Sequence, residues 1–90
     1  MRKTYNQLER IIKGFANHRR IEILELLKKQ PELSVAEISD RLKINFKNAS
    51  GHIQKMAVAG LIIKRYDANN VRHKLTLRGK TILEFCRILE

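Results

Sequence analysis

The stretch Ser34–Gly60, which reads SVAEISDRLKINFKNASGHIQKMAVAG, contains the features that decide the fold. Ser34 and Glu37 have the spacing of a capping box, in which each side chain accepts a hydrogen bond from a free amide at a helix start. This pattern predicts a helix from about Val35 to Lys43.

A second helix is predicted after only two residues, Ile44 and Asn45. Asn45 is a favourable N-cap, and Gly60 suits the left-handed residue that ends many helices. Between them, apolar residues recur at i, i+4 and i+7 of one face, at Ala49, Ile53 and Met56. A helix from Phe46 to Ala59 therefore follows the first across a tight turn, which makes a helix-turn-helix.

Two more helices are expected before this unit. Leu8, Ile11, Ile12 and Phe15 have the spacing of one apolar helix face, which predicts a helix over about residues 4–15. Asn17 can cap the next helix, His18–Lys29, which must end before Pro31.

After Gly60 the apolar period changes from 3.6 to 2, which predicts a β-hairpin. The turn is assigned to Asp67–Asn70, because Asp and Asn tolerate left-handed backbone. Thr76 then caps a last helix over about residues 77–89. The side chains expected to face inward are Leu61, Ile63, Val71, His73 and Leu75, and those expected to face outward are Lys64, Arg72 and Lys74.

The order of these elements predicts one α+β, mostly α, domain over residues 1–90. Its expected architecture is a winged helix-turn-helix, with a three-helix core, a two-stranded β-hairpin wing and flanking N- and C-terminal helices. No apolar run approaches the roughly 20 residues of a membrane span, and the N-terminus lacks the apolar core of a signal peptide. With a single cysteine, Cys86, the expected location is the reducing cytoplasm.

The net charge of +10 is concentrated in the middle of the chain. Residues 41–80 hold ten Lys or Arg against Asp67 alone, a net of +9, whereas residues 1–40 hold eight against six acids, a net of +2. Such concentration is typical of a surface that binds a polyanion. The alternative is a generally basic, well-solvated protein.

Several segments resemble ArsR-type winged helix-turn-helix regulators: Phe15–Leu24, Ile38–Leu42, Ile44-Asn45, Ser50–Ile53 and Ala59–Ile62. The closing Leu75–Lys80 is similar to the exit from the wing in MarR- and PadR-like relatives. The resemblance covers about residues 8–80. It implies a homodimeric, sequence-specific transcriptional regulator of double-stranded DNA, which inserts the helix from Phe46 to Ala59 into the major groove and reads two half-sites about one DNA turn apart.

The resemblance implies that Lys47, Asn48, Ser50, Gly51 and Gln54 lie at the DNA, and the chemistry of the residues fits. Asn and Gln can pair bidentately with adenine, and Lys can bind phosphate or guanine. The alternative is a solvated helix face, although Gly51 costs about 1 kcal/mol inside a helix and so needs a reason. Relatives often carry a larger residue there. His52 can contact phosphate or be a half-buried structural residue. The recognition set is Asn45, Lys47, Asn48, Ser50, Gly51, His52, Gln54 and Lys55.

Two further surfaces are expected. Lys64, Arg65, Arg72 and Lys74 form a wing that can grip DNA, or they only protect a sheet edge from pairing. The last helix is apolar on more than one side, and the first helix is also terminal and apolar. This suits a dimer interface, unless these residues pack only on their own domain. The expected dimer residues are Leu8, Ile11, Ile12, Ile82, Phe85, Cys86 and Leu89.

The chain lacks the marks of several other functions. The Cys-x-Cys pair of metal-sensing relatives would fall on Ser34 and Ala36, so neither a metal nor another cofactor is expected. There is no phosphate-cradling Gly-rich loop or nucleophile elbow, which argues against an enzyme. Cys86 is either a redox switch or a small core residue. The rival to a DNA reader is a winged helix used as a protein-interaction or RNA-binding module.

Overall fold

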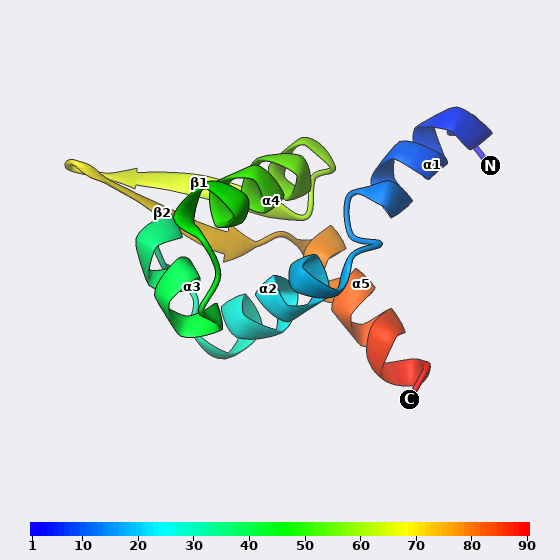
Figure 1. Cartoon of the computed structure of the whole chain (residues 1–90). Coiled ribbons are helices and arrows are strands. Elements are labelled where there is room, and N and C mark those ends of the chain that lie inside the picture. Colours follow the sequence, from blue (N-terminus) through cyan, green and yellow to red (C-terminus); the bar gives the residue numbers. More distant parts are fainter.

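The computed structural model describes residues 1–90 as five helices and one two-stranded antiparallel sheet (Figure 1). This arrangement confirms the predicted α+β winged helix-turn-helix. None of the helices is long and apolar enough to cross a bilayer. In chain order the elements are α1 (Tyr5–Lys13), α2 (His18–Lys29), α3 (Val35–Leu42), α4 (Phe46–Val58), β1 (Ile62–Asp67), β2 (Asn70–Leu75) and α5 (Leu77–Ile88).

The helix starts are where the capping residues predict them. The side chains of Asn17, Ser34, Asn45 and Thr76 each accept hydrogen bonds from backbone amides in the first turn of α2, α3, α4 and α5. Ser34 forms the complete capping box. Gly60 has φ +78°, the left-handed conformation expected after α4. Capping chemistry therefore positions both helices of the helix-turn-helix.

Four helix ends come earlier than predicted, and one of them is that of α4, which was expected to reach Ala59 and stops at Val58. Helix α1 stops at Lys13, and its C-cap Gly14 lies so close to the end of α4 that a Cβ on Gly14 would overlap that of Ala59. Phe15 therefore leaves the helix and packs on the core. Helix α3 stops at Leu42 because Lys43 takes left-handed backbone, with φ 55°, and α5 stops at Ile88.

The hydrophobic core lies between α2, α3, α4, the root of the hairpin and α5. Helix α1 contributes no buried residue and projects from this body, as does the C-terminal half of α5 (Figure 1). The anchors predicted on α4 are confirmed, since Ala49, Ile53 and Met56 are all buried. The twelve-residue core cluster is Ile23, Leu24, Leu27, Leu33, Ile38, Ile53, Met56, Ala59, Leu61, Ile62, Leu75 and Leu83.

The side-chain alternation predicted for the first strand is wrong by one residue. Ile62 faces the core opposite Leu75, whereas Ile63 is 51% exposed. Leu61 is buried too, but it lies before the strand, so the two-residue period begins only at Ile62. The left-handed residue in the turn is Ala68, with φ 55°, rather than an Asp or Asn.

A short bridge joins the hairpin to the body of the domain. The amide of Glu32 donates to the carbonyl of His73 at 2.9 Å, and the amide of His73 donates to that of Leu33 at 2.9 Å. The His73 ring is 1% exposed, and its Nδ1 donates to Leu33 O at 2.8 Å. Burial lowers the pKa of His73, so this histidine is neutral in the folded protein at neutral pH.

Candidate nucleic-acid interface

The outer face of α4 is a row of polar side chains held out from the core. Residues 47, 48, 51, 54 and 55 share one side of the helix, because they are spaced by three or four residues or are direct neighbours. All but Gly51 are exposed. No hydrogen bond within the protein uses the side-chain amide of Asn48 or Gln54, so both are free to bind a ligand. We call Lys47, Asn48, Gly51, Gln54 and Lys55 the recognition face.

Two of the predicted DNA-contact residues, Asn45 and Ser50, do not present free side chains on the recognition face. Asn45 Oδ1 accepts from the amides of Lys47 at 2.7 Å and Asn48 at 3.3 Å, so this oxygen is occupied by the helix cap. Ser50 is half-buried and lies beside the recognition face rather than on it. Asn45 thus positions the first turn of α4.

Gly51 has no packing reason to be glycine. A Cβ built at this position would meet no atom within 4 Å, so a larger side chain would fit the fold. Its backbone is helical, so the conformational freedom of glycine is not needed there either. What the missing side chain does is leave the α4 backbone bare on the outer face.

His52 is joined to a second helix. Arg20 Nε donates to His52 Nδ1 at 3.1 Å, so in the neutral ring the proton sits on Nε2. Desolvation by burial, followed by the charge of Arg20, lowers the pKa of His52. The half-buried structural interpretation of this histidine therefore fits its contacts, and its Nε2–H is still a donor.

Lys64, Arg72 and Lys74 do not share one outward face, which corrects the sequence prediction. Lys64 is opposite His73 in the sheet and so lies on the core-side face of the hairpin. Arg65 and Arg72 are opposite each other on the other face, which Lys74 shares. The alternation starts one residue later than assumed, and this moves Lys64 to the opposite face.

The two wing arginines are already paired. Arg65 Nε lies 2.9 Å from Glu32 Oε1 and 3.2 Å from Oε2. Arg72 Nε donates to Asp67 Oδ2 at 3.2 Å, and its Nη1 donates to the carbonyl of Glu32 at 3.1 Å. Lys64 and Lys74 have no carboxylate within 4 Å and carry the free charge of the wing.

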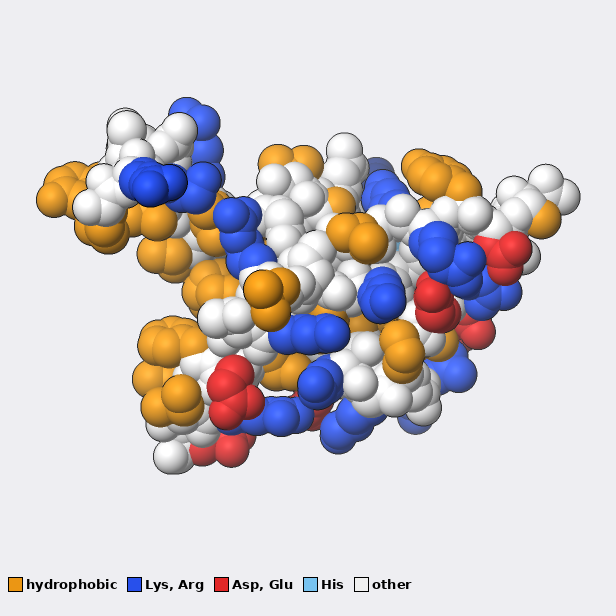
Figure 2. Space-filling view, turned by 180° about the vertical axis from the view of Figure 1, so that it is seen from behind, with side chains coloured by type: hydrophobic (Ala, Val, Ile, Leu, Met, Phe, Trp, Pro, Cys, Tyr) orange, Lys and Arg blue, Asp and Glu red, His pale blue; other side chains and the backbone are white.

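The terminal helices expose apolar side chains at one end of the molecule. Figure 2 shows hydrophobic atoms gathered over α1 and α5 at its left. Of the predicted dimer residues, Ile12, Phe85 and Leu89 are exposed, while Leu8, Ile11, Ile82 and Cys86 are half-buried. Sequence reasoning missed Tyr5, 81% exposed, and Ile88, 72% exposed. Tyr5 could have been found, because it precedes Leu8 by three residues and Ile12 by seven.

Sequence reasoning also missed a basic groove between α1 and α4, which encloses about 890 Å³. Its cations come from four helices and from the segment before α1, and its lining contains no Asp or Glu. A charge sum could not find it, because the nearly balanced residues 1–40 supply most of these cations. No group of three His, Cys, Asp or Glu side chains could hold a metal ion. We define the basic groove by Lys3, Arg10, Lys13, Arg20, Lys55 and Arg78.

Comparisons with known proteins agree with this geometry. The model of the family described as bacterial regulatory protein, arsR family, matches residues 17–64, which run from the cap of α2 into β1. No curated protein matches the sequence.

Solved structures match nearly the whole chain. HlyU from Vibrio cholerae is 32% identical, with a TM-score of 0.81, over 99% of this chain and 97% of that one. The transcriptional regulator HlyU from Vibrio vulnificus is 29% identical, with a TM-score of 0.75, over 93% and 88%. A domain from Mycobacterium bovis is 25% identical, with a TM-score of 0.83, over 93% and 78%. It is described as a homodimeric winged helix-turn-helix DNA-binding domain and a possible ArsR-family transcriptional regulator.

Proposed function

This chain belongs to the ArsR family of bacterial regulatory proteins, and from that premise we propose how it performs its function as a DNA-binding transcriptional regulator. It acts as a homodimer, each copy inserts α4 into the major groove of its half-site, and the base sequence is read by the recognition face. The two half-sites lie about one DNA turn apart.

The observation that carries this proposal is the recognition face itself. Its Asn48 and Gln54 amides are unpaired within the protein, and the helix beneath them is fixed at one end by the Asn45 cap and along its length by buried anchors. Such amides pair bidentately with the N6 and N7 positions of adenine, each pair contributing about 1–3 kcal/mol of discrimination. The flanking Lys47 and Lys55 supply contacts to phosphate or guanine.

The wing supports α4 with charge. Lys64 and Lys74 extend from a two-stranded hairpin that β2 ties to the body through His73, so the lysines are carried on a held element rather than a loose loop. They bind phosphates next to the half-site, which adds affinity without sequence preference.

The homodimer joins through the projecting terminal helices. Tyr5, Ile12, Phe85, Ile88 and Leu89 would otherwise expose their apolar surface to water. Helix α1 has no buried residue in the single chain, so a partner supplies the burial it lacks. The homodimeric state of the M. bovis domain supports a homodimer.

Selection of bound sequences from random duplex DNA tests the proposal. We expect an inverted repeat among the winners, with a dimer mass by light scattering. Asn48→Ala or Gln54→Ala should relax the preference at particular bases and weaken binding to the selected site by about 5- to 150-fold, as the loss of one bidentate pair predicts. Lys28→Ala, an exposed cation of α2 far from the recognition face, is the control and should keep the wild-type preference.

Two outcomes would contradict the proposal. A sequence preference that survives every change on the recognition face would exclude α4 as the reader. Equal competition by double-stranded RNA, whose deep and narrow major groove does not admit a helix, would favour a different nucleic-acid partner.

A further inference from the structure

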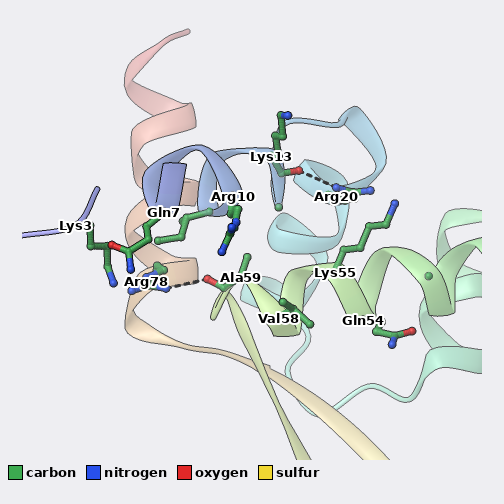
Figure 3. A pocket seen from close by; sticks show the side chains of 13 residues that line it. Lys3, Gln7, Arg10, Lys13, Arg20, Gln54, Lys55, Val58, Ala59 and Arg78 are labelled. Carbon is green, nitrogen blue, oxygen red and sulfur yellow. Dashed lines mark hydrogen bonds between the residues drawn. The ribbon is translucent and has the colours of Figure 1, made fainter. Parts of the chain in front are cut away.

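The basic groove is a concave surface beside the recognition face, with walls made by α1 and α4 (Figure 3). Arg10 extends from α1 toward α4, and Lys55 extends from α4 on the opposite side (Figure 3). Arg20 of α2 and Arg78 of α5 close the two ends. Gly51, Gln54 and Lys55 belong to both this groove and the recognition face.

The cations of the groove are held in place without being neutralised. Arg20 Nη1 donates to the carbonyl of Lys13 at 2.8 Å, and Arg78 Nη1 donates to that of Ala59 at 2.9 Å. These uncharged partners orient the guanidinium groups and satisfy helix-end carbonyls that would repel an anion. Arg10 and Lys55 have no carboxylate within 4 Å.

Lys13 is the only groove cation with an acidic neighbour. Its Nζ lies 3.4 Å from Glu9 Oε1, and both side chains are more than half exposed. Such a solvated pair is weak and can exchange for another anion. Six cations around one cavity repel one another, and a bound polyanion would relieve that repulsion.

Gly51 is a second observation that points to a ligand. Glycine inside a helix costs about 1 kcal/mol relative to alanine, and here neither packing nor backbone conformation requires it. Its bare backbone lies in the lining of the groove. The absent side chain leaves room for a bound group against α4.

We propose that the basic groove is a phosphate-binding site, in which Arg10, Lys13 and Lys55 bind the anion and Gly51 lets it approach α4. Phosphate can come from two sources: the DNA backbone beside the major groove read by α4, or a free phosphorylated small molecule. The DNA source rests on the proposed function, whereas the small-molecule source does not. A free ligand would compete with DNA, since it would cover Gly51, Gln54 and Lys55.

The first arm of the test uses pyrophosphate and the full-length protein without DNA, at low salt, with binding followed by calorimetry. Loss of the charged contacts in Arg10→Gln/Lys13→Gln should weaken binding at least roughly tenfold. Lys28→Gln/Lys29→Gln removes the same number of charges from the exposed end of α2 and should bind as the wild type. Gly51→Glu places a carboxylate in the groove from α4, without altering α1, and should abolish binding.

The second arm measures the affinity for duplex DNA against salt concentration. If DNA phosphates occupy the groove, Arg10→Gln/Lys13→Gln should make the negative slope of log K against log salt shallower by about 1.8. Lys28→Gln/Lys29→Gln should leave this slope unchanged. Light scattering and thermal unfolding confirm that the variants keep the wild-type assembly and fold.

The two arms assign the source. Weakened pyrophosphate binding alone identifies a free phosphorylated ligand, a reduced salt slope alone identifies the DNA backbone, and both changes together identify a site that the two share. Wild-type behaviour of Arg10→Gln/Lys13→Gln in both arms overturns the proposal. The sequence preference carried by Asn48 and Gln54 is measured separately, so it can survive that result or fail independently of it.

Discussion

Helix α4 is flanked by two basic surfaces, the wing on one side and the basic groove on the other, and their charges differ in what opposes them. On the wing, Arg65 is paired with Glu32 and Arg72 with Asp67. In the groove, only Lys13 has an acidic neighbour. The net charge counted along the sequence is concentrated in residues 41–80. Glu32 lies outside that range, but its carboxylate pairs with Arg65 and so neutralises part of this charge. Unpaired positive charge is therefore found both on the wing, within the strongly basic residues 41–80, and in the groove, whose cations come mostly from the nearly balanced residues 1–40.

One glycine on the wing side and one on the groove side differ in packing. At the root of the wing, Gly79 of α5 lies so close to the chain at Leu61 that an added Cβ would overlap the Leu61 carbonyl oxygen. Beside the groove, a Cβ on Gly51 would meet nothing. One glycine is thus required by the fold, and the other is left open to a ligand. Gly14, which also lines the groove, is itself packed tightly against Ala59, so the contrast lies between Gly79 and Gly51 and not between the two whole sides.

Gly79→Ala should have the largest effect on this contrast. The new methyl group must displace buried backbone, and overpacking of this kind costs about 1–3 kcal/mol. We expect the Tm to fall by at least about 5 °C. Lys80→Ala, at the next and exposed position of the same helix, should leave the Tm close to wild type. A wild-type Tm for Gly79→Ala would show that the root of the wing is not tightly packed.

Acidification should weaken the wing side through His73. Its pKa is lowered in the folded state, so between the ordinary value of 6.5 and that lower value the unfolded chain binds a proton that the native chain does not. The contribution of neutral His73 to the free energy of unfolding is fully present above about pH 6.5. It is lost as the pH falls, by at most about 1.4 kcal/mol per pH unit.

The measurement is the Tm of wild type and His73→Asn between pH 7.5 and 5.5. Asn can still donate to the carbonyl of Leu33 but cannot titrate, so its Tm should depend less on pH. Gln30→Asn, at an exposed position without an ionisable group, is the control and should keep the wild-type dependence. An unchanged dependence in His73→Asn would assign the acid sensitivity to another group, with His52 the next to test because its pKa is lowered too.

Gly51→Ala should change stability and binding in opposite directions. Alanine gains up to about 1 kcal/mol of helix propensity, and its methyl group meets no atom of the protein. The Tm should rise by roughly 4–8 °C, while the affinities for DNA and pyrophosphate fall, because the methyl group occupies the space of the ligand. Higher stability with unchanged binding of both would remove Gly51 from the proposed sites.

The smallest expected effect is on the salt dependence of DNA binding, which should differ between substitutions of the unpaired and of the paired cations of the wing. Lys64→Ala should make the negative slope of log K against log salt shallower by about 0.9. The loss of affinity between about 50 and 200 mM salt should then be roughly three- to fourfold smaller than for the wild type. Lys74→Ala should do the same. Arg65→Ala should change the slope by less than half as much, because this arginine is engaged with Glu32. Equal losses from Lys64 and Arg65 would break the contrast drawn between free and paired charge.

The local features of the fold could be read from the sequence. Asn17, Ser34, Asn45 and Thr76 mark helix starts because a cap is a short-range bond between a side chain and a nearby amide. The spacing of Ala49, Ile53 and Met56 identifies the buried side of α4 for a similar reason, since the period of a helix is fixed.

Features that depend on distant partners could not be read in this way. The face occupied by Lys64 follows from where β1 begins, and that is set by packing at Leu61 and Ile62. The pairing of Arg65 with Glu32 joins residues 33 positions apart. The groove needs α1 and α4 side by side, an arrangement that no local pattern of residues encodes.

Arg20 connects the helix proposed for dimerisation, α1, to the helix proposed for DNA recognition, α4. Its side chain donates hydrogen bonds to the carbonyl of Lys13 at the end of α1 and to the ring of His52 in α4. Helix α1 has no buried anchor of its own, so these bonds help to set its tilt. In a twofold-symmetric dimer joined through α1, both copies tilt together, and a rotation that tilts α4 toward or away from the twofold axis changes the angle between the two α4 helices by twice that tilt. A substitution at Arg20 would then alter which separation of half-sites the dimer prefers, although Arg20 lies outside the recognition face.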